Sequence, residues 1–250
     1  MIASDLHLHT LWCDGKASPA EMACAAFEKG MKRIGFSCHS YTWFDEEYCI
    51  ARENIPLYIA EIRALAGEYA GRMEILCGVE QDIDSREDSS WADYVIGSVH
   101  YIEKNGRYYP IDNSEEDFRE LLAAFGGDAD ALAEAYFAKE AEIVRRTGAD
   151  IIGHFDLITK FNEGGKLFDE STPRYRAAWQ QAADVLLRTG VPFEINTGAI
   201  SRGYRTEPYP SAEIRSYIRA HGGTLILSSD AHAPENIGYR FDAFEKYLGK

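Results

Sequence analysis

The sequence predicts an α/β fold: one domain, residues 1–250, in which parallel strands form a closed or nearly closed barrel. Two observations favour this class. Seven short apolar runs alternate with helical stretches along the 250 residues, as in parallel sheets whose strands are joined by right-handed crossovers. Six of the seven runs lead into a histidine or an acidic residue, and such barrels gather their functional residues at the carboxyl ends of the strands. An open, doubly wound sheet is the alternative, but its functional residues would cluster at one switch point.

The strands are expected where β-rich apolar runs are bounded by turn residues. The first run lies directly before His7 and His9, and the last lies before Asp230. The expected strands are 2–6, 33–37, 73–79, 93–99, 149–153, 192–196 and 224–228. No internal repeat, low-complexity tract or linker interrupts this order, which supports one domain.

The helices are predicted from the residues at their ends. Ser18 and Glu21 have the spacing of a capping box, with Pro19 at the first helical position. Pro56 and Pro173 open two further helices, and glycines follow several of the helical runs. Helices are expected at 18–29, 56–69, 114–126, 128–146, 172–190 and 211–221 and after residue 234, with loops at 41–54 and 161–171.

Candidate metal ligands follow the strands. His7 and His9 are two residues apart, which places both imidazoles on the same side of a strand. The pair alone is weak evidence, since two surface histidines would look the same. The later strands add His39, Glu80, His100, His154, Asp230 and His232. Imidazoles suit zinc, manganese or iron, and carboxylates offset the repulsion between divalent ions about 4 Å apart, whereas calcium or magnesium prefers all-oxygen ligands.

Composition narrows the partners. The 26 Lys and Arg against 41 Asp and Glu give a net charge of −15, which opposes binding to nucleic acid or to an anionic membrane. No run of eighteen apolar residues and no signal-peptide pattern is present. Five cysteines without a Cys-x-x-Cys motif predict a reduced, cytoplasmic protein. Cys13 and Cys38 lie beside candidate ligands, where a thiolate ligand is the alternative to a small buried hydrophobe.

These motifs together resemble a known family, the polymerase and histidinol phosphatase (PHP) superfamily. The matching segments, in chain order, are Asp5-x-His7-x-His9-Thr10, Asp14-Gly15, His39, Gly78-x-Glu80, Gly97-Ser98-Val99-His100, Gly153-His154 and Ser229-Asp230-x-His232. Segments 97–102, 153–158 and 194–198 resemble more narrowly its histidinol-phosphatase branch. The resemblance implies a distorted, TIM-like (β/α) barrel of seven strands that holds a trinuclear metal centre.

The resemblance also implies an allocation of ligands to two or three divalent ions. The implied sets are His7, His9, Glu80 and Asp230 for the first ion, Glu80, His100 and His154 for the second, and Asp14, His39 and His232 for the third. Glu80 would bridge two ions, and Glu80, Asp230 and His232 are the expected catalytic residues. Many histidinol phosphatases that resemble this chain have histidine where Asp14 stands, a departure that bears on the identity and affinity of the third ion.

Such a centre suits hydrolysis of a phosphate monoester. A water that bridges the metals is expected to lose a proton, because the ions lower its pKa from about 15.7 toward 7. No nucleophile motif such as Gly-x-Ser-x-Gly is present. The sequence therefore predicts a metal-dependent phosphatase acting on a small phosphorylated substrate, with L-histidinol phosphate first. Another small phosphate ester, or a non-catalytic metal-stabilised module, remains the alternative, and the oligomeric state stays open.

A phosphate also needs fixed cations. Arg202 follows the sixth strand and is the first candidate, with Arg205 and Lys160 next. Lys160 stands where the resemblance implies a basic pair, and a lysine acts as a point charge rather than a bidentate fork. For each of them the alternative is a solvated surface charge. Glu194 is expected to make an interior hydrogen bond or to meet the substrate amine, and Asp156 to orient an imidazole or to cap a helix.

Overall fold

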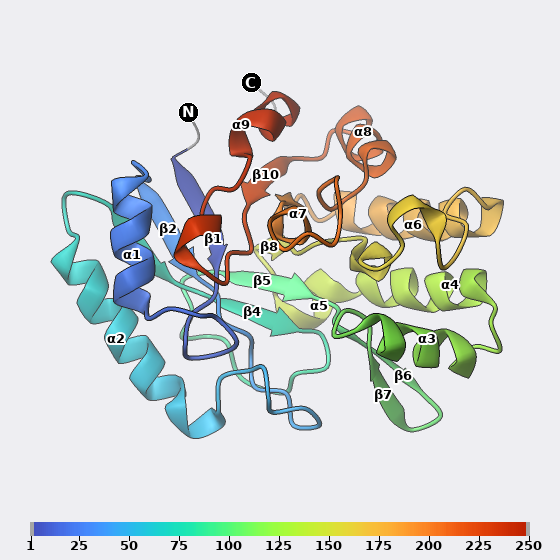
Figure 1. Ribbon diagram of the computed structural model, residues 1–250, viewed down its shortest axis with the longest axis horizontal. Helices are drawn as coiled ribbons and strands as arrows, with labels where there is room; N and C mark the ends of the chain where they lie inside the picture. Colours follow the sequence, from blue (N-terminus) through green and yellow to red (C-terminus); the bar gives the residue numbers. More distant parts are fainter. Residues whose placement is uncertain (1–2, 249–250) are drawn as a thin grey trace.

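The computed structural model describes residues 3–248. Its parallel strands form two sheets, and a separate antiparallel hairpin extends from them (Figure 1). The three-stranded sheet has the order β1 (Ser4–Leu8), β2 (Arg33–Phe36) and β3 (Glu74–Cys77). The five-stranded sheet has the order β10 (Leu225–Ser228), β9 (Phe193–Asn196), β8 (Ile151–Ile152), β5 (Val95–Ser98) and β4 (Val79–Asp82). All pairs within these two sheets are parallel, as the alternating pattern predicts.

The two sheets are connected at the carboxyl ends of their strands. Only Gly78 separates β3 from β4, so one stretch of chain pairs first with β2 and then with β5. Parallel bridges also join Leu8 to Ala231 and His39 to Glu80. The ends of β1 and β10, and of β2 and β4, therefore lie next to one another.

Tyr94 explains two glycines in this region. Its hydroxyl donates to the carbonyl of Leu6 at 2.5 Å. Its ring forms a buried cluster with Ile96 and Ile151. A Cβ added at Gly35 would lie 2.2 Å from the Tyr94 hydroxyl, and one at Gly78 would lie 2.3 Å from its ring. Only glycine leaves room for this tyrosine at both positions.

The helices cover the strands on two sides. Figure 1 shows α1 and α2 on one side of the strands and α3, α4 and α6 on the other. The α-helices are α1 (Pro19–Glu28), α2 (Ile55–Glu68), α3 (Glu115–Ala124), α4 (Ala129–Glu140), α5 (Ile143–Thr147), α6 (Pro173–Leu187), α7 (Gly198–Ser201), α8 (Ala212–Ala220) and α9 (Phe241–Phe244). The capping box of Ser18 and Glu21 is confirmed in both directions. None of the helices within residues 3–248 is long and apolar enough to cross a membrane.

Several predicted boundaries are wrong. The first strand runs on through His7 to Leu8, while Ile2, its expected first residue, lies outside the described residues. Glu80 lies inside strand β4 rather than after a strand. The expected helix at 128–146 breaks after Glu140, and residues 234–248 form only short turns of helix. The loop expected at 161–171 contains the 3-10 turn Glu163–Gly165.

The hairpin of β6 (Tyr101–Lys104) and β7 (Arg107–Pro110) was not predicted, although Asn105-Gly106 between the strands is a common hairpin turn. The hairpin follows His100 directly, so it extends from the same end of the strands that carries the candidate ligands.

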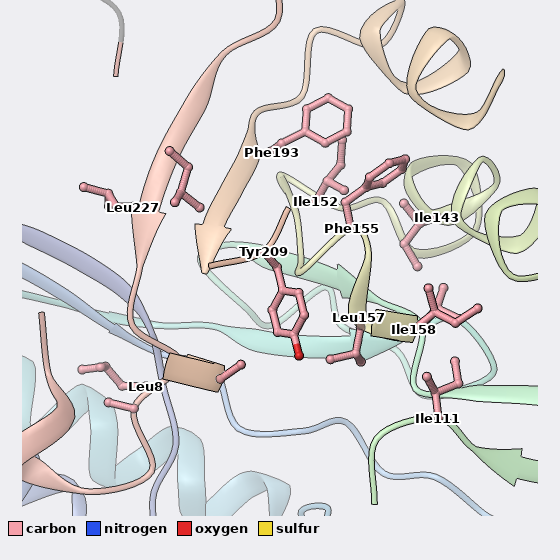
Figure 2. Packing of buried hydrophobic residues seen from close by; sticks show 14 of the residues in the cluster. Leu8, Ile111, Ile143, Ile152, Phe155, Leu157, Ile158, Phe193, Tyr209 and Leu227 are labelled. Atoms are coloured by element: carbon pink, nitrogen blue, oxygen red, sulfur yellow. The ribbon is translucent and has the colours of Figure 1, made fainter. Parts of the chain in front are cut away.

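One part of the core lies between the strands and the helices α4 and α6. Phe155 packs edge-on against Phe193 at 5.5 Å and contacts Phe137 of α4 at 5.4 Å between ring centroids. Figure 2 shows Phe155, Phe193, Ile152 and Ile143 gathered in this layer. Because these side chains are fully or almost fully buried, they hold β8 and β9 firmly, and with them the segments that follow each strand.

Candidate metal centre

The nine predicted ligands converge at the carboxyl ends of the parallel strands. They come from six segments far apart in sequence, after or within β1, β2, β4, β5, β8 and β10. Three groups bring one ligand atom from each member within 4.8 Å of the others: His9, Asp14, His39 and His232; His7, His9 and Asp230; and His39, Glu80 and His100. His154 joins them through Glu80, with its Nε2 2.9 Å from the Glu80 Oε1.

Glu80 stands at the middle of this arrangement. Its two carboxylate oxygens are within 3.4 Å of five different imidazoles. The nitrogen-to-oxygen distances are 3.2 Å for His7, 3.4 Å for His9, 3.0 Å for His39, 3.3 Å for His100 and 2.9 Å for His154. The hydroxyl of Ser98 donates to Glu80 Oε1 at 2.6 Å and fixes its orientation. A carboxylate that reaches so many ligands suits a bridge between two cations.

Several buried atoms at the centre meet no partner in hydrogen-bond geometry within residues 3–248. They include Nε2 of His7, Nε2 of His9 and Oε2 of Glu80. A buried polar atom without a partner costs about 1–3 kcal/mol, so three in one place point to a missing partner. A divalent cation accepts imidazole nitrogen and carboxylate oxygen together, and the residues present fit such an ion.

The electrostatics of His9 and Glu80 suit a bound cation, whereas burial is outweighed by facing carboxylates, which raise the pKa of His7, His39 and His100. Burial, together with His232 and His39, lowers the pKa of His9 to about 3, so the ring is neutral at neutral pH, as a ligand must be. Burial raises the pKa of Glu80, but the facing rings of His39 and His7 outweigh it and hold that pKa well below the usual value. The Glu80 carboxylate is therefore charged and available to a cation.

Asp230 follows β10 and faces the imidazoles of His7 and His9. Its backbone adopts the left-handed conformation at φ 50°, which aspartate tolerates better than most residues. Its Oδ1 lies 3.4 Å from Nε2 of His9 and 3.9 Å from Nε2 of His7. Burial raises its pKa, but Arg202 and His7 outweigh this and lower the pKa well below the usual range.

Asp14 reaches the third group of ligands. Its Oδ2 lies 3.0 Å from Nε2 of His232, and its Oδ1 lies 3.7 Å from both Nδ1 of His9 and Nε2 of His39. The groups share His9 and His39, so the geometry admits more than one allocation of ligands to ions.

A second layer of hydrogen bonds orients the imidazoles. Glu194 is fully buried, and its Oε2 lies 2.9 Å from Nδ1 of His7. Because a carboxylate only accepts, His7 donates from Nδ1 and turns Nε2 toward the centre. Glu194 Oε1 accepts from the backbone N–H of His154 at 2.8 Å and from Asn196 Nδ2 at 2.8 Å. Of the two expectations for Glu194, the structure favours the interior hydrogen bond.

Asp82 is a functional residue that the sequence reasoning missed. Its Oδ2 accepts from the backbone N–H of His100 at 3.1 Å and lies 3.3 Å from the ring Nδ1 of His100. The available signal was its position two residues after Glu80, on the same side of the strand. Asp156 occupies the N-cap position of the 3-10 turn Leu157–Thr159, but its side chain makes no capping hydrogen bond there. Its Oδ2 instead accepts from the backbone N–H of Ser211 at 2.9 Å.

The three predicted phosphate-binding cations separate in the structure. Arg202 and Lys160 line a cavity of about 150 Å³ over the ligands. Arg202 donates from Nη2 to Asp230 Oδ2 at 3.0 Å, and its Nη1 lies 2.9 Å from Nδ1 of His232. Arg205 is not among the described residues that line this cavity; its Nη1 donates to the carbonyl of Thr159 at 2.7 Å.

Parallel strands that deliver imidazoles and carboxylates to one point define a class, the α/β proteins with a multinuclear metal centre. The model of the PHP domain family matches residues 5–198, which is more than half of the chain. The chain therefore belongs to the PHP domain family.

Similarity to curated relatives indicates the branch of the family to which the chain belongs. The "probable histidinol-phosphatase" of Deinococcus radiodurans is 34% identical over 252 residues, covering 95% of this chain and 89% of the relative. The histidinol-phosphatase of Bacillus subtilis is 27% identical, covering 96% of this chain and 97% of the relative. Both alignments span nearly the full length of each protein, which places the chain in the histidinol-phosphatase branch.

Solved structures share the fold. A Listeria monocytogenes protein assigned to the histidinol phosphatases superposes with a TM-score of 0.83 at 19% identity, covering 96% of this chain and 99% of that one. The histidinol phosphate phosphatase of Lactococcus lactis, in complex with zinc, L-histidinol and phosphate, superposes with a TM-score of 0.68 at 21% identity, covering 98% and 93%. At these identities the likeness concerns the α/β fold.

Proposed function

We propose that this protein is a metal-dependent histidinol-phosphatase, which hydrolyses L-histidinol phosphate to L-histidinol and phosphate in histidine biosynthesis. The observation that carries the proposal is Glu80, a buried carboxylate within 3.4 Å of five imidazoles. The near full-length similarity to curated histidinol-phosphatases supports the same substrate.

The proposed ligands are the nine residues predicted from the sequence: His7, His9, Asp14, His39, Glu80, His100, His154, Asp230 and His232. They would hold two or three divalent ions of zinc, manganese or iron. The zinc bound by the Lactococcus lactis relative supports zinc among these. Bound ions would supply an activated water and offset the negative charge of the phosphoryl group.

The chain's own residues prepare the rest of the reaction. Arg202 lines the cavity of about 150 Å³ over the ligands, where its guanidinium would bind the phosphoryl group by a charge-assisted hydrogen bond. Glu80, Asp230 and His232 line the same cavity, and we assign catalytic roles to them because they surround the place where the phosphorus must sit. Lys160 would add a single charge, although Asp112 already accepts from its Nζ. Arg205 acts, in this proposal, by holding the carbonyl of Thr159 and with it the loop that carries Lys160.

The proposal extends to the fold. We infer that β3 and β4 act as one bent strand, so that the chain closes into a single, distorted, seven-stranded (β/α) barrel domain. The bridges Leu8–Ala231 and His39–Glu80 support closure. The net charge of −15 argues against a nucleic-acid substrate. Because all five cysteines are free, we infer that the protein functions in a reducing, cytoplasmic compartment.

The test is phosphate release from a panel of esters, with the metal content of the same sample measured before and after chelation. We expect L-histidinol phosphate to give the highest kcat/KM among the esters and chelation to abolish turnover until zinc or manganese is restored. Equal or better turnover of sugar or nucleotide phosphates would contradict the substrate assignment. Full activity in protein free of metal would contradict the mechanism.

A further inference from the structure

A second, larger cavity adjoins the proposed phosphate site. It has a volume of about 360 Å³, within the range of roughly 300–1,000 Å³ usual for small-molecule sites. The two cavities share Asp14, His39, His100, Asp112 and Lys160 in their walls. The unpartnered, buried oxygen of Glu80 belongs to a residue that lines the smaller cavity. The reacting phosphorus is therefore assigned to the smaller cavity, and the larger one is left for the leaving group.

Two of the four carboxylates in the larger cavity already face a basic side chain. Asp14 lies 3.0 Å from His232. Asp112 accepts from the ammonium of Lys160 at 3.1 Å. Burial raises the pKa of Asp112, but Lys160 outweighs it and lowers that pKa to about 2. These two residues therefore bring little uncompensated charge to the cavity.

Asp45 and Glu47, on the loop between β2 and α2, are different. Asp45 Oδ2 accepts from the hydroxyl of Tyr101 at 2.7 Å, and its Oδ1 accepts from the backbone N–H of Glu47 at 3.3 Å. Both donors are neutral, so they orient this carboxylate without cancelling its charge. Glu47 lines the same cavity and makes no ion pair within residues 3–248. Asp45, which is half-buried, and Glu47, which is exposed, thus bring two carboxylates to the cavity that form no ion pair among the described residues.

Aromatic rings also line this cavity. Tyr48 stands edge-on to His39 at 4.9 Å between centroids, and its ring lies 6.0 Å from that of Tyr101. Aromatic faces next to carboxylates favour a cationic or heteroaromatic group over a neutral sugar. The larger cavity therefore combines the carboxylates of Asp45 and Glu47 with the aromatic rings of Tyr48 and Tyr101.

We propose that Asp45 and Glu47 form the subsite that binds a positively charged leaving group, so that the enzyme selects phosphate monoesters of amino alcohols. This inference rests on the proposed phosphatase function and deepens it. L-Histidinol has a protonated amine and an imidazole, and both fit an anionic cavity with aromatic walls. Sugar phosphates lack a cation at this end, and nucleotides of a single phosphate bring no ammonium group to meet these carboxylates.

The experiment compares Asp45→Asn and Glu47→Gln with the wild type. Glu46→Gln is the matched control, since Glu46 lies between them, is exposed and bonds only to Tyr41 among the hydrogen bonds of the described residues. Two esters have a cationic leaving group, L-histidinol phosphate and O-phosphoethanolamine, and two have an uncharged one, glycerol 3-phosphate and p-nitrophenyl phosphate. Metal content and melting temperature are measured for every variant.

For the cationic esters we expect KM to rise about tenfold in either variant, with kcat little changed, because a charge-assisted contact made equally in ground and transition states is removed. The uncharged esters and the Glu46→Gln protein should keep wild-type values within about twofold. Asparagine retains one oxygen for the Tyr101 hydroxyl and loses only the longer bond, the one from the backbone N–H of Glu47 at 3.3 Å. The loop should therefore keep its shape.

Each other outcome has a defined meaning. Equal losses on both classes of ester, or no change on the cationic ones, would overturn the subsite. Wild-type preference for uncharged esters would overturn it as well. If the wild type ignored L-histidinol phosphate but hydrolysed O-phosphoethanolamine with the same dependence on Asp45, the named substrate would fail and the subsite would stand.

Discussion

Replacing Glu194 by glutamine should reverse the tautomer of a metal ligand. In the native structure Nδ1 of His7 donates to Glu194 Oε2 at 2.9 Å, which leaves Nε2 free for a cation. A glutamine has one oxygen and one NH₂ group. Its oxygen is retained where Glu194 Oε1 sits, because that position accepts two donors, at 2.8 Å each. The NH₂ group must then face His7, whose Nδ1 becomes the acceptor and whose Nε2 becomes protonated.

The magnitude follows from the lost contact. A buried, charge-assisted hydrogen bond contributes about 1.5–3 kcal/mol, and every 1.4 kcal/mol is about tenfold in a dissociation constant. We therefore expect Glu194→Gln to weaken metal binding about 10- to 100-fold, the range usual for groups that orient a ligating histidine. The melting temperature of the metal-free variant should stay close to that of the metal-free wild type, since glutamine has nearly the same volume as glutamate.

The assay is competition for zinc between the protein and a chromophoric chelator, read without reference to turnover. Glu213→Gln, on the exposed side of α8, removes the same charge far from the centre and serves as the control. If Glu194→Gln bound zinc within about twofold of the wild type, the reasoning about the His7 tautomer would be refuted.

Three further perturbations probe other parts of the structure. Arg202→Ala should raise KM about tenfold or more and loosen the Asp230 ligand, because the guanidinium donates to Asp230 Oδ2 at 3.0 Å; initial-rate kinetics with unchanged KM would remove Arg202 from the site. Burial raises the pKa of Glu140 well above its usual value, so the folded state holds this proton more tightly than the unfolded chain and the wild type loses stability as the pH rises above about 4.3. The free energy of unfolding of Glu140→Gln, measured in urea, should therefore rise relative to that of the wild type between pH 5 and pH 8. A difference that did not depend on pH would contradict this argument from burial. Gly78→Ala should lower the free energy of unfolding by about 1–3 kcal/mol, since its Cβ would lie 2.3 Å from the Tyr94 ring; a melting temperature equal to the wild type would contradict that clash.

The sequence by itself determines which residues can bind metal and where along the chain they lie. His7, His39, His100 and His154 each follow or end a short β-rich run. Parallel strands put such residues at one end of the sheet whatever the loops between them do. The capping residues Ser18 and Thr172 likewise act within one turn of helix, so the helix starts near them were predictable.

Contacts between distant segments were decided only by the tertiary structure. The central place of Glu80 depends on β4 continuing from β3 past Gly78, a strand change that no local pattern encodes. Arg205 donates to the Thr159 carbonyl, whereas Arg202 lines the cavity. This difference depends on how the loop after β9 packs against the loop after β8. The uncompensated charge at Asp45 could be recognised only after Lys160 was seen to pair with Asp112. A sequence specifies which groups exist and how neighbours along the chain are spaced, whereas the pairing of charges across space depends on packing of the whole fold, because electrostatic and hydrogen-bond energies depend on distances that only the folded chain defines.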